Sequence, residues 1–333
     1  MRRGFVAWML WPISVVFSII VAVRRALFAA RVLKAKRLPV PVIVVGNIFI
    51  GGTGKTPFTI WLVESLRRAG YVPGVISRGY GTQNDVPQAV TSASVPQDVG
   101  DEPVLIAGRA QCPVVVGRNR VAAAQALLQA HPDVNLIISD DGLQHYALER
   151  NLEIVLCDAR GNGNGWLLPA GPLREPAARR RDFTVFNAEQ APLGIPSDAV
   201  RMQLIGETVE RLSDRSQSMA MHAIPQFQTV HGNPPRIVAA AGIGNPARFF
   251  ATLRGAGLVF EEMPLPDHYD FAGNPFERAE ADLILITEKD AVKCSRIDAL
   301  LNDPRIWVVP VTARIDEALA KRIVEKFRGS PIA

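Results

Sequence analysis

The sequence predicts an α/β protein: a domain built on a parallel sheet, a second and smaller α/β domain, and a hydrophobic N-terminal helix that associates with a membrane. Three observations predict this class. A strand, glycine turn and helix pattern surrounds residue 50, a second such pattern follows residue 236, and an uncharged stretch stands near the N-terminus. With 333 residues, 48% of them hydrophobic, the chain can bury a large core, which excludes wholesale disorder.

The N-terminal region combines an apolar stretch with a basic block. Gly4 to Val23 carries no charge and has about the length that a helix needs to cross a bilayer, and Trp8 and Trp11 suit the headgroup boundary. The basic residues, which no acid accompanies, are Arg2, Arg3, Arg24, Arg25, Arg31, Lys34, Lys36 and Arg37. Such a block binds nucleic acid or an anionic membrane, and the apolar stretch favours the membrane, so we expect no nucleic-acid partner. A buried core helix and a cleaved signal peptide are the alternatives.

A glycine-rich turn is the strongest local signal. Pro41 to Gly46 predicts a buried parallel strand, and Pro57 to Gly70 predicts an amphipathic helix. The turn between them contains Gly51, Gly52, Thr53, Gly54, Lys55 and Thr56. Glycines let backbone N–H groups face phosphate oxygens at a helix N-terminus, while the lysine reaches the β- and γ-phosphates and the threonine ligates Mg²⁺. We therefore expect a P-loop NTPase-like nucleotide site, although the strict pattern has glycine where this chain has Phe49.

An acid pair follows another apolar run and completes such a site. Val134 to His145 predicts a strand with Asp140 and Asp141 at its C-terminal end. Buried aspartates are costly unless a cation neutralises them, so this position favours Mg²⁺. An ordinary Asp-Gly turn is the alternative.

Two further motifs are candidates for proton transfer. Asp101 and Glu102 are expected in a loop between the two strands, and phosphoryl transfer to a hydroxyl needs a group that accepts its proton. His268 lies in a proline-rich loop between Asp267 and Asp270. A solvated acid and a structurally idle histidine are the alternatives.

Arginines follow two predicted strands, at the sheet edge where ligands bind. Arg78, in the motif at residues 77–81, and Arg118 and Arg120 are candidates for phosphate contacts, with an exposed surface as the alternative. The segment from Gly171 to Phe183 carries Glu175 and four basic residues, which indicates either a solvated face or a site for an anionic substrate.

The second half of the chain predicts a smaller unit. Prolines and polar residues at 221–235 indicate a hinge, and strands are expected near 236–241, 282–287 and 305–315, with a last helix at 316–327. We divide the chain into an N-terminal helix at 1–38, a P-loop domain at 39–225 and a C-terminal α/β domain at 226–333.

Taken together, these segments resemble one family, the tetraacyldisaccharide 4'-kinases of lipid A biosynthesis. The resemblance covers nearly the whole chain and follows the family's order. Its motifs are the hydrophobic N-terminus, "VGNIFIGGTGKTP", "SRGYG", "VGDEP", "SDDGLQH", "PAGPLREP", "PDHYDF" and "TEKDAVKC". The family's loop matches the P-loop only from the second glycine pair onward, so Phe49 does not oppose the resemblance.

The resemblance implies a kinase that transfers the ATP γ-phosphate to the 4'-hydroxyl of a tetraacylated glucosamine disaccharide 1-phosphate. It further implies a site on the cytoplasmic face of the bacterial inner membrane, and we expect a monomer. Asp101 would be the general base, with His268 supporting it, and residues 52–56 would hold phosphates and metal together with Asp140 and Asp141. Arg120, Glu175 and His145 would be further site members, and residues 287–290 would lie where the base is read. Two P-loop-like α/β domains would close around ATP.

Two other functions stay open on the sequence. A membrane-bound nucleotide-switch ATPase shares the glycine turn, but such proteins usually carry a second lysine where this chain has Ile50. A soluble small-molecule kinase or ligase is the other, and the apolar stretch from Gly4 to Val23 opposes it.

Overall fold

The protein contains two sheets, seen in a computed structural model that describes residues 3–79, 86–227 and 234–328. The first sheet has nine strands. In spatial order these are β15 (Thr312–Ile315), β8 (Val200–Ile205), β7 (Phe183–Asn187), β6 (Leu152–Asp158), β1 (Val42–Asn47), β5 (Leu136–Asp140), β2 (Pro73–Ser77), β4 (Val114–Val116) and β3 (Gln88–Val90). Neighbouring strands from β8 to β4 pair in parallel, and the two edge strands are antiparallel.

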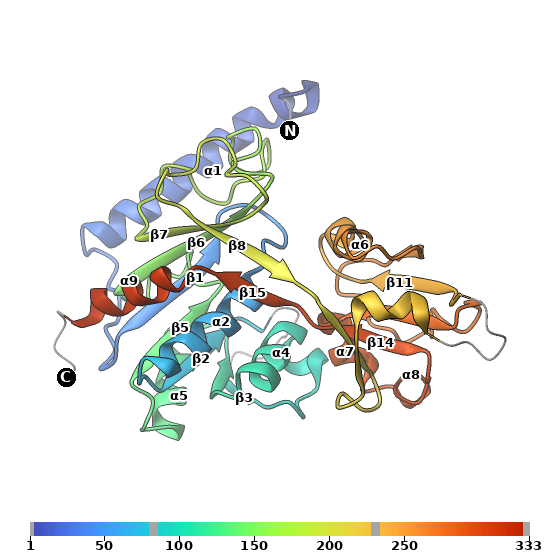
Figure 1. Cartoon of the computed structure of the whole chain (residues 1–333). Helices are drawn as coiled ribbons and strands as arrows, with labels where there is room; N and C mark the ends of the chain where they lie inside the picture. Colours follow the sequence, from blue (N-terminus) through green and yellow to red (C-terminus); the bar gives the residue numbers. More distant parts are fainter. Residues whose placement is uncertain (1–2, 80–85, 228–233, 329–333) are drawn as a thin grey trace.

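The second sheet has six strands and lies beside the first (Figure 1). In spatial order these are β10 (Ser218–Ala220), β9 (Thr208–Arg211), β14 (Ile306–Val309), β13 (Leu283–Thr287), β11 (Ile237–Ala241) and β12 (Glu261–Pro264). We call each sheet with its covering helices the first and the second unit.

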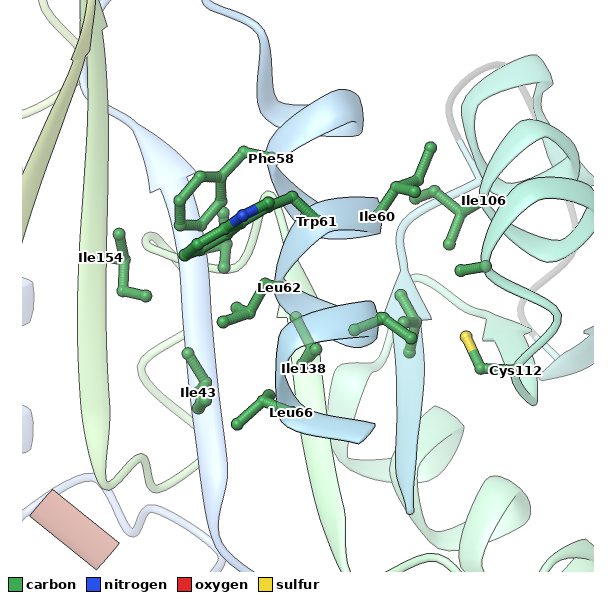
Figure 2. Close-up of a cluster of buried hydrophobic side chains, with 14 of the residues drawn as sticks. Ile43, Phe58, Ile60, Trp61, Leu62, Leu66, Ile106, Cys112, Ile138 and Ile154 are labelled. Carbon is green, nitrogen blue, oxygen red and sulfur yellow. The ribbon is translucent and has the colours of Figure 1, made fainter. Parts of the chain in front are cut away.

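Helices cover both faces of the large sheet because its central strands are apolar on both faces. In β1, Ile43 and Val45 enter one core, while Val42 and Val44 enter the other. The first core also receives residues of α2 (Lys55–Arg68), α3 (Pro96–Val99), α4 (Asp101–Ala110) and α9 (Glu317–Arg328). The second receives residues of α5 (Arg120–Ala130). Figure 2 shows α2 directing Phe58, Leu62 and Leu66 toward the strands.

The second unit repeats this layering on a smaller scale. One face packs against α6 (Pro246–Gly255) and the 3₁₀ helix η1 (Met221–Gln226), and the other against α7 (Glu288–Cys294) and α8 (Asp298–Leu301). The strand and helix predicted after residue 236 are thereby found as β11 and α6. Residues 228–233 of the predicted hinge and residues 80 and 81 of the arginine motif lie outside the described residues.

Two predicted boundaries differ from the sheets. The single strand predicted at 305–315 is two strands, β14 and β15, separated at Pro310 and belonging to different sheets. The division at residue 226 also does not follow sheet membership, because β9 and β10 belong to the second sheet while β15 and α9 return to the first. The antiparallel pairs β15–β8 and β14–β9 make this return possible, and they form a two-stranded connection between the units (Figure 1).

The N-terminal helix α1 (Phe5–Ala29) lies along the first unit (Figure 1). Among the described residues it alone is long and apolar enough to cross a membrane by length and composition. One face is attached to the protein: Ser14 is buried and its Oγ donates to the Leu167 carbonyl oxygen at 2.6 Å. The other face exposes apolar side chains, which include Phe5, Val6, Trp8, Met9, Trp11, Ile13, Val16, Ile19, Ile20 and Val23.

The return of α9 to the first core predicts a specific stability effect. Ile323 of α9 is completely buried in that core, so Ile323→Ala should lower the free energy of unfolding by about 2–5 kcal/mol, measured by urea denaturation. Val259→Ala, at a position that is 89% exposed, is the control and should change it by less than about 0.5 kcal/mol. Equal effects of the two substitutions would mean that α9 does not belong to this core.

Candidate active site

The glycine turn joins β1 to α2 at the carboxyl edge of the large sheet. Gly54 adopts φ 94°, and a Cβ there would come within 2.9 Å of the Asn187 amide nitrogen, so only glycine fits. The helix begins at Lys55 rather than at the predicted Pro57, which places Lys55 and Thr56 in its first turn. This is the geometry in which helix N–H groups bind phosphate.

Position 49 is a packing position, which explains why it need not be glycine. Phe49 is 2% exposed and belongs to the second core of the large sheet. The guanidinium of Arg160 lies 4.3 Å from the centre of its ring. Arg160 also donates to the Gly52 carbonyl oxygen at 3.1 Å and so supports the turn from outside.

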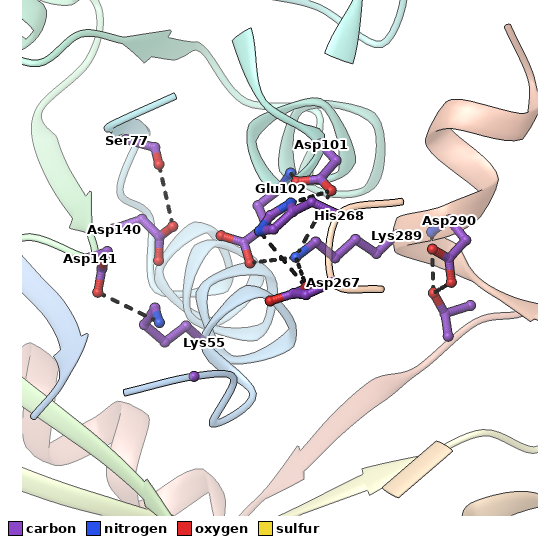
Figure 3. A network of polar contacts seen from close by, with 12 residues as sticks. Lys55, Ser77, Asp101, Glu102, Asp140, Asp141, Asp267, His268, Lys289 and Asp290 are labelled. Carbon is purple, nitrogen blue, oxygen red and sulfur yellow. Dashed lines mark hydrogen bonds and ion pairs between the residues drawn. The ribbon is translucent and has the colours of Figure 1, made fainter. Parts of the chain in front are cut away.

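The side chain of Lys55 points toward the sheet edge and the acid pair. Its Nζ donates to Oδ1 of Asn47 at 3.2 Å and lies 3.6 Å from Oδ1 of Asp141 (Figure 3). As predicted, Asp140 lies at the C-terminal end of a strand, β5. This strand pairs with β1 on one side and β2 on the other. The turn and the acid pair therefore meet at one edge of the sheet.

The two aspartates differ in their surroundings. Asp140 is 1% exposed, and burial, together with the nearby Glu102, raises its pKa to about 7. Its Oδ1 accepts a hydrogen bond from Thr59 at 3.3 Å. Burial also acts to raise the pKa of Asp141, but the charges of Lys55 and Arg174 outweigh it and lower that pKa below the usual value. Nη1 of Arg174 lies 3.2 Å from Oδ2 of Asp141.

A magnesium ion fits these residues. Within the described parts of the chain, no lysine or arginine forms an ion pair with the buried Asp140, so its charge is undercompensated. Among the described residues, no three His, Cys, Asp or Glu side chains are grouped so that they could hold a metal ion by themselves. Mg²⁺ commonly takes one or two carboxylates, with water and substrate phosphates as its other ligands, so Asp140, Asp141 and the Thr56 hydroxyl suffice as protein donors.

Arg120 and Glu175 have structural partners that the sequence did not indicate. Arg120 is 2% exposed and donates to the Gly117 carbonyl oxygen at 2.7 Å, behind the acid pair rather than on the cavity wall. Burial lowers its pKa to about 10. Glu175 does reach the cavity, but its carboxylate accepts hydrogen bonds from Arg179 and, at 2.7 Å, from the Tyr146 hydroxyl.

Asp101 and His268 come together from the two units, although 167 positions separate them. Nδ1 of His268 lies 3.1 Å from Oδ2 of Asp101 (Figure 3). Asp101 was predicted in a loop, but it is the first residue of α4 and is 4% exposed. His268 adopts φ 60°, and its backbone N–H donates to the Gly242 carbonyl oxygen at 3.1 Å.

Two lysines of α7 complete this cluster: Lys289, which lies in the segment at 287–290, and Lys293, which was not among the predicted site residues. Nζ of Lys293 lies 3.2 Å from Oδ2 of Asp101, and Nζ of Lys289 lies 3.9 Å from the same atom. Burial alone would raise the pKa of Asp101, but the His268 hydrogen bond and the two lysine charges hold that pKa well below its usual range. The i, i+4 spacing of the lysines was the available signal, because it places both on one helix face. The segment at 287–290 thus lies beside Asp101.

A cavity of about 660 Å³ connects these groups. Its lining includes Gly51, Lys55, Asp101, Asp141, His145 and His268 on the polar side, and Phe17, Ile20 and Val21 from α1 on the apolar side. Burial and the charges of Arg120 and Arg78 lower the pKa of His145 to about 4, so its imidazole is neutral near pH 7. The cavity suits a substrate with a charged or polar head and an apolar tail.

Comparison with known proteins identifies relatives over the full chain. The sequence model of the tetraacyldisaccharide-1-P 4'-kinase family matches residues 6–328. A tetraacyldisaccharide 4'-kinase from Janthinobacterium sp. (strain Marseille) is 64% identical over 332 residues, covering 100% of this chain and 95% of that protein. One from Herminiimonas arsenicoxydans is 61% identical over 337 residues, with the same coverage.

A solved structure agrees in fold. The crystal structure of LpxK from Aquifex aeolicus in complex with ATP superimposes with a TM-score of 0.79 at 28% identity, covering 97% of this chain and 100% of that one.

The contacts of Glu175 predict a large cost for removing its partner. Arg179→Met would leave a 1% exposed carboxylate without its cation and should lower the free energy of unfolding by about 3–5 kcal/mol, measured by urea denaturation. The control is Arg236→Met, whose pair with Glu280 is exposed and should contribute less than about 1 kcal/mol. Adding Glu175→Gln to Arg179→Met should restore part of the loss, and a failure to do so would contradict the pairing.

Proposed function

The chain belongs to the tetraacyldisaccharide-1-P 4'-kinase family, and from that premise we propose how its residues share the work of phosphoryl transfer. The protein is an ATP-dependent kinase that transfers the γ-phosphate to the 4'-hydroxyl of a tetraacylated glucosamine disaccharide 1-phosphate, which forms the lipid A 1,4'-bisphosphate precursor. The observation that carries the conclusion is the family match over residues 6–328. The single cavity that joins a P-loop, an Asp–His pair and an apolar wall is consistent with it.

The P-loop binds the triphosphate. Backbone N–H groups between Gly51 and Thr56 face the phosphate oxygens, and the ammonium of Lys55 neutralises charge on the β- and γ-phosphates. Asn47 and Asp141 hold the Lys55 side chain, which directs its ammonium toward the sheet edge where the phosphates would lie. This orientation lowers the entropy lost on binding.

Thr56, Asp140 and Asp141 would hold Mg²⁺. When bound, the ion neutralises negative charge on the phosphates. Asp140 is buried beside Thr59 and Ser77, which fix its carboxylate at the end of β5. Asp141 is the more exposed of the two and is shared with Lys55 and Arg174.

His268 accepts the proton of the 4'-hydroxyl, and Asp101 orients it. The family resemblance implied that Asp101 is the base, but a carboxylate whose pKa is held far below its usual range is a weak proton acceptor. Imidazole is the side chain that most often serves as a general base in enzymes. As the O–H proton moves to the ring, the new imidazolium is stabilised by Asp101 across the 3.1 Å contact with Nδ1. The released oxygen then attacks the γ-phosphorus while the β-phosphate leaves.

The helix α1 would place the cavity at a membrane. A substrate with four acyl chains leaves a bilayer at a cost of about 0.8 kcal/mol per exposed CH₂, so the enzyme must come to the lipid. The exposed apolar face of α1 enters the bilayer boundary while its other face stays attached to the protein through Ser14. The basic residues at 24–37 contact anionic headgroups, which supports a position on the cytoplasmic face of the bacterial inner membrane. We propose that the protein acts as a monomer.

Transfer of label from γ-³²P ATP to a glycolipid acceptor tests the proposed roles. His268→Ala and Asp101→Ala should each lower the rate by about 10²–10⁴-fold while ATP binding is retained, because they remove proton transfer and not the phosphate site. Label that appears only as free phosphate when acceptor is present would instead support a nucleotide-switch ATPase. A near-normal rate for His268→Ala would remove the imidazole from the mechanism.

Shortening the chain tests the role of α1. A protein without residues 1–23 should no longer pellet with vesicles that contain phosphatidylglycerol, and its KM for the glycolipid should rise because Phe17, Ile20 and Val21 are lost from the cavity. ATP binding should be unchanged.

A matched variant separates the two effects. Replacing Ile13, Val16 and Ile19 by glutamine changes exposed positions outside the cavity lining and leaves Ser14 in place. This variant should lose vesicle binding but keep the KM measured in detergent micelles. If both proteins still pellet with vesicles, α1 is not the membrane anchor.

A further inference from the structure

The helix α7 carries two nearly buried lysines for which the proposed mechanism has so far given no role. The side chain of Lys293 is 7% exposed and that of Lys289 is 16% exposed. A buried ammonium is costly unless it is paired, so such residues are placed where a carboxylate needs them. Both approach Asp101 of the first unit.

Lys293 contacts both sides of the Asp101–His268 pair. Its Nζ lies 3.2 Å from Oδ2 of Asp101 and donates to the Tyr269 carbonyl oxygen at 2.9 Å. Tyr269 directly follows His268, whose Nδ1 lies 3.1 Å from that same Oδ2. One ammonium group therefore fixes the carboxylate relative to the loop that carries the imidazole.

The two lysines differ in what else they reach. Lys289 lines the cavity and divides its charge among Asp101, Glu102 at 3.3 Å and Asp267 at 3.9 Å. Lys293 is not among the residues that line the cavity, and its one carboxylate contact among the described residues is with Asp101. Lys293 can thus act on the reaction only indirectly, through Asp101 and the loop that carries His268.

The remainder of α7 fixes the imidazole from the backbone side. Oδ2 of Asp290 accepts hydrogen bonds from the Thr287 hydroxyl at 2.6 Å and from the Gly242 N–H at 3.1 Å. The Gly242 carbonyl oxygen in turn accepts the backbone N–H of His268 at 3.1 Å. The same short helix therefore holds both members of the pair.

We propose that Lys293 is a positioning residue of the kinase reaction, which keeps the Asp101 carboxylate ionised and aligned with the imidazole of His268. Because Asp101 belongs to the first unit while His268 and Lys293 belong to the second, the three side chains meet only when the two units are in contact. The proposal rests on the proposed function, since it gives Asp101 and His268 the roles derived there.

The electrostatics of the cluster give the sign of the effect. Burial raises the pKa of Asp101, and His268, Lys289 and Lys293 together overcome it. Among the described residues, the other charged groups that face the cluster are Glu102 on α4, Asp267 beside His268, and Asp290 on α7. Removing the Lys293 charge raises the pKa of Asp101, and a protonated Asp101 cannot stabilise the imidazolium. With one positive charge fewer acting on the Asp101–His268 pair, the pair binds its proton at higher pH, so the acidic limb of the pH–rate profile moves to higher pH.

Steady-state kinetics with ATP and the glycolipid in micelles test this. Lys293→Gln removes the charge but keeps a hydrogen-bond donor for the Tyr269 carbonyl; it should lower kcat by about 10- to 100-fold, leave the KM for ATP little changed, and move the acidic limb upward. Lys293→Arg keeps the charge and should retain most of kcat and the original pH profile. Lys326→Gln breaks a 2.9 Å pair with Asp182 away from the cavity and should leave both unchanged.

A double-mutant cycle with Asp101→Asn separates this proposal from the proposed function. Without the Asp101 charge, adding Lys293→Gln should cause no further loss of kcat. If Asp101→Asn itself keeps the wild-type rate, the proposed roles of the pair are wrong.

Three results would overturn the role of Lys293 and leave the proposed function standing. The first is an impaired Asp101→Asn together with a Lys293→Gln that keeps the wild-type kcat and pH profile. The others are a Lys293→Arg as impaired as Lys293→Gln, or additive losses in the cycle. Should Lys293→Gln fail to fold, the double variant compared with Asp101→Asn still decides, because it leaves neither charge unpaired.

Discussion

The contact between Asp101 and His268 is the interaction on which the rest of the site depends. The first unit holds the glycine turn, Lys55, Asp140 and Asp141. Of the Asp101–His268 pair it contributes only the carboxylate. The imidazole and the two lysines come from the second unit. In the proposed mechanism each unit alone lacks part of the chemistry, so the relative placement of the two sheets would be a catalytic constraint as well as a structural one.

Several features of the fold serve that placement. The chain passes from the first sheet to the second between β8 and β9 and returns between β14 and β15, so two antiparallel segments connect the units. Beside this connection, the buried Glu288 pairs with Arg109 of α4 at 2.5 Å and accepts the Val311 N–H at 3.1 Å. A buried carboxylate with partners on both units opposes their separation, because opening would expose it or leave it unpaired.

Local patterns predicted those parts of the site that short stretches of chain determine. The strand, turn and helix around Lys55, the strand that ends in Asp140, and the apolar helix at the N-terminus were all predicted, because spacing and glycine content specify them directly. The start of α4 at Asp101 was missed. No side chain caps it, and residues 100–103 contain Gly and Pro, which favour a loop. What fixes Asp101 is contact with residues more than 160 positions away.

Local patterns also could not predict the surroundings of Glu175 and Arg120, or the boundaries between the two units. Glu175 and Arg120 were selected from motifs. Their partners Arg179 and the Gly117 carbonyl are only four and three positions away, but the burial of both side chains, and the contact of Glu175 with Tyr146 29 positions away, depend on tertiary packing. The polar segment at 221–235 resembled a hinge, but sheet membership is decided by the pairing of β15 with β8, which has no local signal. Tertiary contacts override composition at both places.

A structure of the protein with Mg²⁺ and a non-hydrolysable ATP analogue tests the central claim most directly. The account predicts that the terminal phosphate contacts Nζ of Lys55 and that the Asp101–His268 contact persists with the imidazole facing that phosphate. A terminal phosphate bound away from Lys55, or a His268 ring separated from Asp101 and turned from the nucleotide, would contradict it.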